Sequence, residues 1–388
     1  MNNTNRFKAF YLCGYGAMGV MNPLISQYLS GIGFNGTQIG TVTSVATAIA
    51  VFASAFWGDR YSNSRDGRKV IAFICLTAAA MGLINVWVTP FLLFVVTYGV
   101  QYFFQGPVMG VADALVLEKD NENFSAIRLC GAVGYAAAVF AGGRIGEDMG
   151  LVSIFYIYAA FFVLAGLLIM TTGKRGPVAA AGSREKRERI GYGQLLHDKK
   201  AIQLIICGIF VMGTNVANNT YFSFLFRDGG GTVAGVGTAF LLMVGSEAPF
   251  MALAPKLCKK FSQEKVIGAA MALSALRFSF YALGPSCEIL LATFFLQGMV
   301  NGVLLTEYVK YLSAVVEPRF IGLAVAAFYA VSSNGGTILC NFFGGVAMDY
   351  LGSVGVYGFF GALNFIGVVL YVMFGLHKKK SKERSDTN

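Results

Sequence analysis

Long apolar runs, separated by short polar segments, follow one another along almost the whole chain. Each holds roughly 20 residues, the length at which a helix crosses about 30 Å of hydrocarbon. The runs are continuous rather than alternating, which excludes a transmembrane β-barrel. The pattern predicts an all-α, multi-pass membrane protein with twelve transmembrane helices, at residues 7–30, 39–57, 69–88, 91–117, 126–147, 151–173, 201–226, 233–256, 265–284, 288–312, 319–343 and 353–376.

Two short motifs recur about half a chain apart. The segment Phe-Phe-Gln-Gly that begins at Phe103 returns as Phe-Leu-Gln-Gly at Phe295. A Gly-Gly-x-x-x-acid pattern that ends at Glu147 returns with its acid at Asp349. A duplicated apolar unit is typical of transporters built from two related bundles. We therefore expect six-helix bundles at 1–173 and 201–376, a cytoplasmic linker at 174–200 and a cytoplasmic tail at 377–388.

Composition and charge agree with a membrane location. The chain is 56% hydrophobic and 13% charged, whereas a soluble domain has about 25% charged residues. Its net charge of +10 comes from Lys and Arg gathered in alternate loops, while the other loops hold almost none. This positive-inside pattern places both termini in the cytoplasm of a prokaryotic cell, with the protein in its plasma membrane. The excess charge is therefore explained by topology, and no nucleic-acid partner is expected.

Catalytic and metal-binding patterns are missing from the sequence. The seven cysteines are scattered singly, without the spacing of a metal site, so we expect neither a metal nor another cofactor. No nucleophile constellation supports an enzyme, and no Gly-rich nucleotide-binding loop with Lys supports an ATP-driven pump. An ion gradient remains as the energy source.

Two oppositely charged residues lie inside the eighth and ninth apolar runs. Glu247 and Arg277 fall near the middle of these runs, so neighbouring antiparallel helices would bring them to a similar depth and allow mutual neutralisation. One interpretation is a permanent structural ion pair. The other is a switch for proton coupling, in which a helix shift removes the guanidinium and the carboxylate takes up a proton.

A second pair of charges lies in the fourth and fifth runs. The fourth run contains Asp113, and the fifth begins near Arg128. Tyr135 follows two helical turns beyond Arg128 on the same helix face. An acid, a guanidinium and an aromatic ring can bind a hydroxyl-rich ring by edge hydrogen bonds and stacking. Both charges also fall in the cytoplasmic third of their runs, so a salt bridge of the cytoplasmic gate is an equal alternative.

The loop between the second and third runs carries a family resemblance. It reads Gly58-Asp59-Arg60, then Asp66-Gly67-Arg68-Lys69. This resembles the Gly-x-x-x-Asp-Arg-x-Gly-Arg-Lys signature of the major facilitator superfamily, although the spacing differs. The resemblance implies a cytoplasmic gate formed by Gly58, Asp59, Arg60, Gly67, Arg68 and Lys69.

Two further patterns resemble one group within that superfamily, the proton-coupled lactose permeases, nucleoside symporters and phenylpropionate-type permeases. They are Arg-x-x-Gly-x-x-Gly-Tyr from Arg128 to Tyr135, and Glu247 with Pro255 and Arg277 downstream. The resemblance implies that Arg128 binds substrate beside Asp113 and that Tyr135 stacks on it. It assigns Glu247 and Arg277 to proton coupling or to the site beside it, and the sequence adds Asp113 as a second candidate for carrying the proton. Gln297 stands in place of lactose permease's His and Tyr135 in place of its Trp, so galactoside specificity is not implied.

Amide side chains occupy the first, fourth, seventh and tenth runs. In lipid, a single amide more often joins two helices than binds a ligand. Those four helices line the central cavity in the resembled superfamily, so the amides are candidate substrate-binding residues: Asn22, Gln105, Asn218, Asn219, Gln297 and Asn301.

The sequence thus predicts a secondary active transporter that functions as a monomer. Its expected activity is proton-coupled uptake of a small polar solute, such as a sugar, an oligosaccharide or a nucleoside, by alternating access. The alternative is a proton-driven antiporter that exports drugs or metabolites. Exporters of the resembled superfamily typically carry a Gly-Pro motif in the fifth helix, and residues 128–150 contain no proline.

Overall fold

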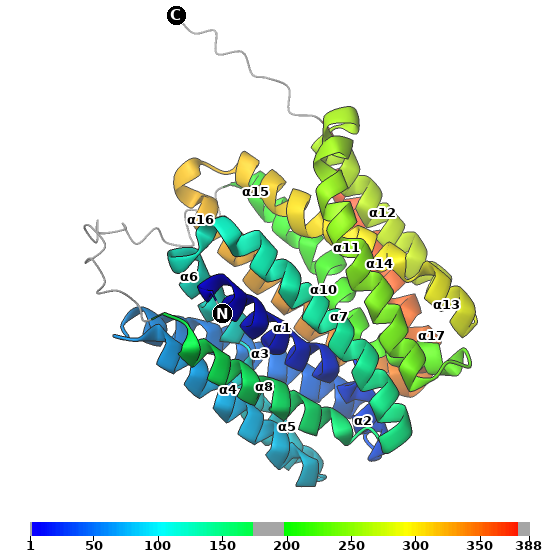
Figure 1. The fold of residues 1–388 in the computed structure, drawn as a ribbon. Helices are drawn as coiled ribbons and strands as arrows, with labels where there is room; N and C mark the ends of the chain where they lie inside the picture. The colour runs from blue at the N-terminus through cyan, green and yellow to red at the C-terminus, as the bar shows by residue number, and fades with distance from the viewer. Residues whose placement is uncertain (1, 174–197, 379–388) are drawn as a thin grey trace, which may run out of the picture.

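The computed structural model describes residues 2–173, the first half, and 198–378, the second half. The helices run alongside one another in a single bundle, and the described residues form no strand (Figure 1). The expected linker at 174–200 and tail at 377–388 lie almost entirely outside the described residues. The helices of the first half are α1 (Asn3–Met21), α2 (Ile25–Gly31), α3 (Gly36–Ser62), α4 (Gly67–Ile84), α5 (Phe91–Gln105), α6 (Val108–Lys119), α7 (Phe124–Met149) and α8 (Ser153–Thr171), with single 3₁₀ turns η1 (Asn85–Trp87) and η2 (Asn121–Asn123).

The second half contains both α-helices and π-helices. The π-helical segments are η3 (Leu304–Tyr308) and η5 (Phe328–Gly335), and η4 (Pro318–Phe320) is a 3₁₀ turn. The α-helices are α10 (Lys199–Asp228), α11 (Val233–Phe261), α12 (Gln263–Tyr281), α13 (Cys287–Thr293), α14 (Phe295–Val303), α15 (Val309–Val315), α16 (Ile321–Ala327) and α17 (Gly336–Met373).

The helices agree with a membrane-spanning chain. Among the described residues, nine helical segments are long and apolar enough to cross a membrane. One of them, Pro318–Met373, holds the last two expected spans, because the helix continues through a kink at Gly352, where φ is 69°. The expected spans 7–30 and 265–284 are also helical, as α1–α2 and α12. The structure is therefore consistent with twelve spans.

Corresponding helices of the two halves are interrupted by different means. In the first half, α1 and α2 separate at Asn22-Pro23, and α5 and α6 separate at Gly106-Pro107. Proline lacks the N–H of a helical turn and clashes with the preceding carbonyl, so the helix breaks there. In the second half, η3 provides the irregular turn between α14 and α15. The fourth and tenth expected spans thus each contain an irregular segment.

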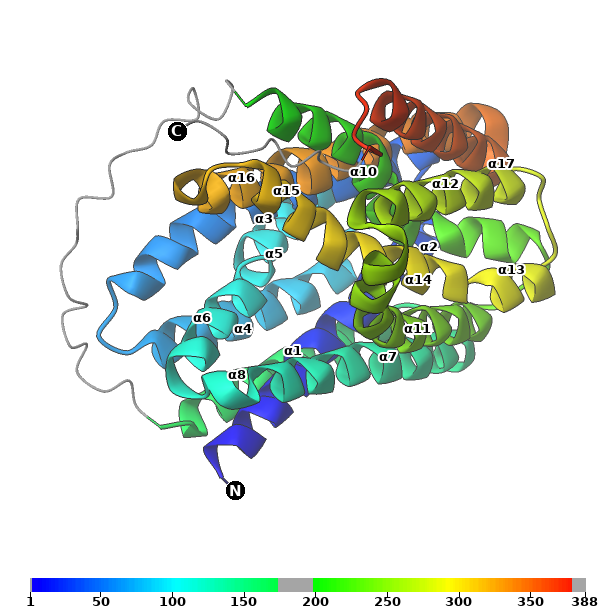
Figure 2. The same cartoon turned by 90° about the horizontal axis from the view of Figure 1, so that it is seen from above.

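Two helix pairs join the halves. Helix α7 packs on α1 and also on α11, while α3 packs on α5 and also on α17 (Figures 1 and 2). Within the second half, α10 and α12 both pack against α17. One continuous cluster of buried apolar side chains reaches from Phe7 in α1 to Phe360 in α17. The side chains between α1, α7, α10 and α11 are therefore held by both halves.

Candidate substrate and proton-coupling site

The expected pair of Asp113 and Arg128 is confirmed. Helix α6 carries Asp113 and α7 carries Arg128, and the Arg128 Nη1 atom lies 3.8 Å from Asp113 Oδ2. Two tyrosines of α1 complete the group: Tyr11 donates a hydrogen bond of 2.5 Å to Asp113 Oδ1, and Arg128 Nη2 donates one of 3.3 Å to the Tyr15 hydroxyl. The Arg128 side chain is 52% exposed, so part of its guanidinium is free to meet a ligand.

Sequence reasoning missed the two tyrosines. Tyr11 and Tyr15 are four residues apart in α1, which places them on one helix face. This spacing of two phenols in an apolar helix was the available signal. What it did not contain was the packing of α1 on α7, which turns that face toward Arg128.

Tyr135 lies farther along α7, where the halves meet. Its hydroxyl is within electrostatic range of Tyr102 in the first half and of Glu247 in the second. Tyr102 donates a hydrogen bond of 2.9 Å to Asn22 Oδ1. Tyr135 thus lies near Glu247 and Tyr102, and Tyr102 in turn binds Asn22.

The expected ion pair between Glu247 and Arg277 is wrong for this conformation. Arg277 is only 3% exposed, and its Nη2 donates instead to Asn215 Oδ1, 3.2 Å away. Its guanidinium also lies over the Phe278 ring, 4.2 Å from the ring centre. Equal depth on neighbouring helices was a sound expectation, but it did not fix the rotation of α12, which turns Arg277 toward α10.

Glu247 and Arg277 both have polar atoms without a hydrogen-bond partner in the described part of the chain. Among the described residues, Glu247 has neither a hydrogen bond nor an ion pair, and Arg277 Nε and Nη1 are buried without a hydrogen bond. Unpaired polar groups in an apolar interior cost free energy. Glu247 and Arg277 therefore both have unused capacity for a ligand, a proton or another conformation.

Three amides of the second half, Asn218, Gln297 and Asn301, take part in side-chain hydrogen bonds. Asn218 Oδ1 accepts a hydrogen bond of 2.6 Å from Tyr357. Gln297 Nε2 donates to the backbone carbonyl of Asn215 at 3.1 Å and to Asn301 Oδ1 at 3.4 Å. Buried amide atoms without a partner remain on Asn218, Asn219 and Gln297.

Gln105 is more firmly tied. Its Oε1 accepts hydrogen bonds from the Tyr158 hydroxyl at 2.8 Å and from Gln101 Nε2 at 3.3 Å. Its own Nε2 is buried without a partner. The structure therefore brings Gln105 into a network of the first half, where it can both brace helices and offer one donor.

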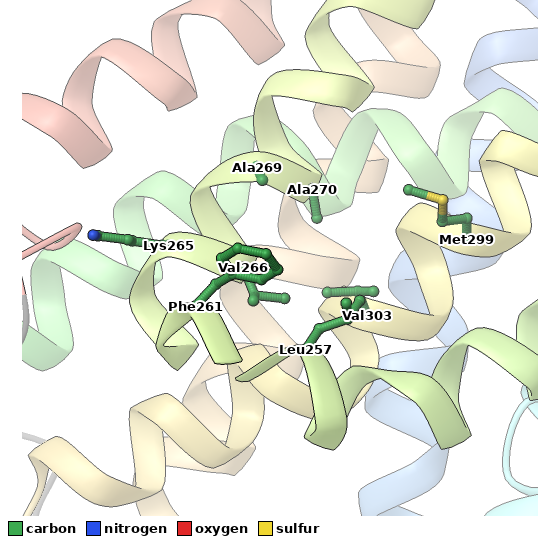
Figure 3. A pocket seen from close by; sticks show the side chains of 8 residues that line it. All are labelled: Leu257, Phe261, Lys265, Val266, Ala269, Ala270, Met299 and Val303. Atoms are coloured by element: carbon green, nitrogen blue, oxygen red, sulfur yellow. The ribbon is translucent and has the colours of Figure 1, made fainter. Parts of the chain in front are cut away.

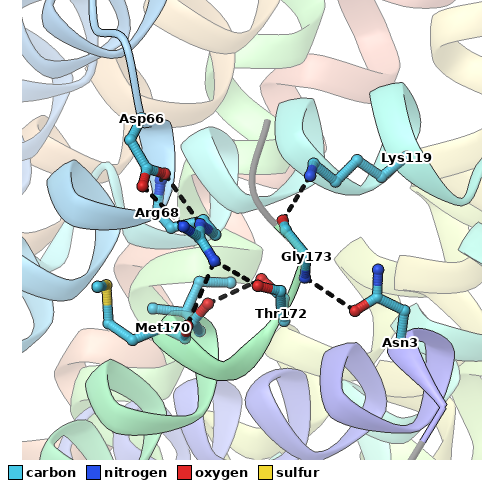
Figure 4. A network of polar contacts seen from close by, with 8 residues as sticks. Asn3, Asp66, Arg68, Lys119, Met170, Thr172 and Gly173 are labelled. Atoms are coloured by element: carbon cyan, nitrogen blue, oxygen red, sulfur yellow. Dashed lines mark hydrogen bonds and ion pairs between the residues drawn. The ribbon is translucent and has the colours of Figure 1, made fainter. Parts of the chain in front are cut away.

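Arg68 connects helices at the expected cytoplasmic end (Figure 4). It forms an ion pair of 2.8 Å with Asp66, and its Nη1 donates to the backbone carbonyls of Thr172 and, at 3.3 Å, of Met170. The hydrogen bond from Arg68 lowers the pKa of the Asp66 carboxyl. Arg68 thus fastens the start of α4 to the end of α8.

Gly173 extends this network to α1 and α6 (Figure 4). Its carbonyl accepts a hydrogen bond of 2.5 Å from Lys119 Nζ, and its N–H donates to Asn3 Oδ1 at 2.9 Å. The ends of four helices of the first half are therefore held together here.

The remaining gate residues stay within the first half. Asp59 accepts a hydrogen bond of 3.0 Å from Asn63, Arg60 lies over the Phe56 ring at 5.4 Å, and Gly67 packs against the Tyr61 ring. Gly58 has open space around it, and Lys69 is exposed. None of the hydrogen bonds or ion pairs described for these six residues reaches the second half, so their role in a gate stays a prediction.

At the opposite end, the acids of the repeated Gly-Gly-x-x-x-acid motif join the halves. Asp349 accepts hydrogen bonds from the Gly36 N–H at 2.5 Å, the Thr37 N–H at 2.8 Å and the Thr37 hydroxyl at 2.5 Å. Glu147 accepts one of 2.8 Å from the Ala234 N–H. Each acid thus lies at the first turn of a helix of the other half, where free N–H groups and the helix dipole favour an anion. We call these two contacts the outer clasps, because the topology expected from the sequence places them on the outer side.

Glycines of the same regions let the backbones approach closely. A Cβ added to Gly36 would lie 2.6 Å from the carbonyl oxygen of Gly345, and one on Gly237 would lie 2.6 Å from that of Val139. Only glycine fits at such distances, as in other close helix pairs in membranes. The halves are therefore tightly closed at the end of the outer clasps.

Removing the outer clasps should loosen this closure unequally. Asp349→Ala removes three hydrogen bonds and Glu147→Ala removes one, so Asp349→Ala should have the larger effect. Loss of a cap at a helix N-terminus costs about 1 kcal/mol, a shift of about fivefold in the open-to-closed ratio. Distances between spin labels on the outer ends of α3 and α17 would measure it. Equal effects of the two variants, or none, would contradict the assignment.

The fold and this site define a class of protein. A bundle of membrane-crossing helices in two halves, with charged and amide side chains between them, is a multi-pass membrane transporter. Residues 4–359 match the MFS_1 like family. The chain belongs to this family of major facilitator superfamily transporters, which are not enzymes.

Individual relatives cover nearly the full chain. The maltose permease of Geobacillus stearothermophilus is 29% identical over 97% of this chain and 96% of its own length. The transporter YwbF of Bacillus subtilis (strain 168) is 29% identical over 94% of this chain and 92% of its own. The crystal structure of nucleoside transporter NupG has a TM-score of 0.82 at 19% identity, covering 98% of this chain and 100% of that one.

Proposed function

We propose that the protein is a proton-coupled symporter that takes up a small polar solute such as a sugar or a nucleoside. The observation that carries the proposal is that the charged residues form two separate groups in different surroundings. Asp113 and Arg128 form a partly exposed polar group with two tyrosines, while Glu247 has no ion-pair partner among the residues that the structure describes. The names of its relatives, a maltose permease and a nucleoside transporter, support this range of solutes.

Substrate binding is assigned to Arg128, Asp113 and Tyr135. A guanidinium donates two parallel hydrogen bonds to neighbouring oxygens, and a carboxylate accepts from hydroxyl groups. Tyr135 would stack on the ring of the solute. The amides with unused hydrogen-bonding atoms would complete the site from the second half: Asn218, Asn219 and Gln297, with Asn22, Gln105 and Asn301 nearby.

Proton coupling is assigned first to Glu247. A charged carboxylate is costly in an apolar helix. Where no cation lies nearby, the carboxyl group becomes neutral only by binding a proton. Arg277 would approach it in another conformation, since two of its nitrogens are unpaired here. Asp113 is the second candidate for a proton carrier.

The closed outer clasps indicate the conformation. With both termini in the cytoplasm, the clasps lie at the outer end, so we infer an inward-facing state of a monomer in the plasma membrane. Transport would then require the bundles 1–173 and 201–376 to rock about the site, with the linker at 174–200 between them and the loop residues near Arg68 as the cytoplasmic gate.

A direct test uses purified protein in proteoliposomes. An inward pH gradient should drive accumulation of a labelled solute, chosen from sugars, nucleosides and aromatic acids by thermal-shift screening. A proton ionophore should abolish it. Accumulation that requires sodium, or only efflux, would contradict the proposal.

Arg128→Lys should weaken binding of that solute at least about tenfold, because Lys does not reproduce the planar two-point contact of a guanidinium. Arg144→Lys is the matched control, since Arg144 lies on the same helix over the Phe140 ring. Binding titrations of both variants would measure the difference. Normal affinity in Arg128→Lys would move Arg128 from the substrate site to the gate.

A further inference from the structure

We propose that the turn between α11 and α12 is a binding site for one anionic phospholipid. The phosphate would lie among the lysines of the turn, and an acyl chain would lie in the apolar groove beside it. This site is separate from the transport pathway and uses none of the residues assigned to substrate or protons.

The groove lies between α11, α12 and α14 (Figure 3). Its volume is about 380 Å³, and its walls are apolar, formed by side chains that include Leu257, Phe261, Val266, Met299 and Val303. Phe261 and Ala269 on its walls are exposed, so the groove opens at the surface of the protein. Its shape and chemistry fit a hydrocarbon chain.

A basic pocket of about 430 Å³ continues the groove at the turn. The two share Phe261 and Lys265, so an amphipathic molecule can occupy both at once. Lys259, Lys260 and Lys265 line the pocket against a single acid, Glu264, which leaves it positive. This juxtaposition of an apolar groove and a cationic pocket matches a phospholipid with an anionic headgroup.

The turn itself has unused hydrogen-bonding capacity. Ser262 has φ of 75° and is the one non-glycine residue with positive φ among those described. Its Oγ is buried without a hydrogen bond, and it precedes α12 without capping the first turn. The N–H groups and dipole of that turn favour an anion. A phosphate oxygen would use the hydroxyl and N–H groups that the protein leaves unpaired.

The neighbouring acid Glu307 does not neutralise the lysines of this pocket. Gln263 donates to Glu307 at 3.0 Å, and Glu307 is paired with Lys310 at 2.8 Å. The charge of Glu307 is thus balanced by a cation outside the pocket. The three pocket lysines have no ion pair among the described residues.

Native mass spectrometry of the full chain in detergent would test the site. Phosphatidylglycerol and phosphatidylcholine with identical acyl chains are added at equal concentration. We expect one tightly bound phosphatidylglycerol, at several-fold higher occupancy than phosphatidylcholine. The triple variant K259Q/K260Q/K265Q should reduce phosphatidylglycerol to the level of phosphatidylcholine.

Two further variants make the result specific. R65Q/K199Q/K200Q removes three exposed cations elsewhere and should keep the preference. A269W, at an exposed position on the wall of the groove, should lower occupancy by both lipids while leaving the thermal unfolding temperature unchanged. Equal loss of preference in both triple variants would overturn the site in favour of general charge attraction. Unchanged binding to A269W would overturn the placement of the acyl chain.

Discussion

Replacing Glu247 with Gln should abolish uphill uptake and leave substrate exchange intact. Each unit of pH gradient supplies about 1.4 kcal/mol per proton, enough for about tenfold accumulation. The amide keeps the size of the side chain but carries no exchangeable charge, so accumulation should fall to the external concentration. Exchange needs only the substrate-binding residues, which this substitution leaves in place.

The measurement compares net uptake with counterflow in the same proteoliposomes. Glu288→Gln is the control, because Glu288 is an acid in the first turn of α13 whose side chain is exposed. Its accumulation should equal that of the unaltered protein. Undiminished uphill transport by Glu247→Gln would leave Glu247 a structural residue and direct attention to Asp113.

Replacing Gly237 with Leu should stop transport by a different route. A Cβ at this position would lie 2.6 Å from the Val139 carbonyl oxygen and 3.0 Å from the Cα atom of Phe140. Helices α7 and α11 would then be unable to close at the end of the outer clasps. We expect transport near background in both directions, while a solute added from the open side still binds.

Gly245 provides the matched control on the same helix. A Cβ there would meet no atom within 4 Å, so Gly245→Leu should transport normally. Uptake and binding of the two variants, with unfolding temperatures as a check on folding, separate a blocked closure from a damaged protein. Normal uptake by Gly237→Leu would show that this close approach is not needed in the cycle.

The sequence was enough to predict the helices and the family, because membrane spans depend on local apolar length. It also brought Asp113 and Arg128 together correctly, since both lie near the short connection between consecutive helices. Contacts between distant helices depend on rotation and packing. For that reason the partners Tyr11 and Tyr15 were missed, and the expected pairing of Glu247 with Arg277 does not occur in this conformation.

The Gly-Gly-x-x-x-acid motif is a second case in which the sequence did not reveal a contact between distant helices. Its recurrence indicated duplication, and Glu147 and Asp349 were visible as its acids. Nothing in either copy says that its acid binds a helix of the other half, because that contact exists only once α7 meets α11 and α3 meets α17. The motif occurs once in each half, and the acid of each copy binds a helix of the other half.

The inequality of the outer clasps sets an order of events. Glu147 gives up a single hydrogen bond when it leaves α11, whereas Asp349 must give up three to leave α3. Separation should therefore begin along α7 and α11, with α3 and α17 acting as the hinge until late in the motion. Although the transporter consists of two related halves, it would therefore open asymmetrically. A solute from outside would first meet the helices that carry Tyr135 and Glu247.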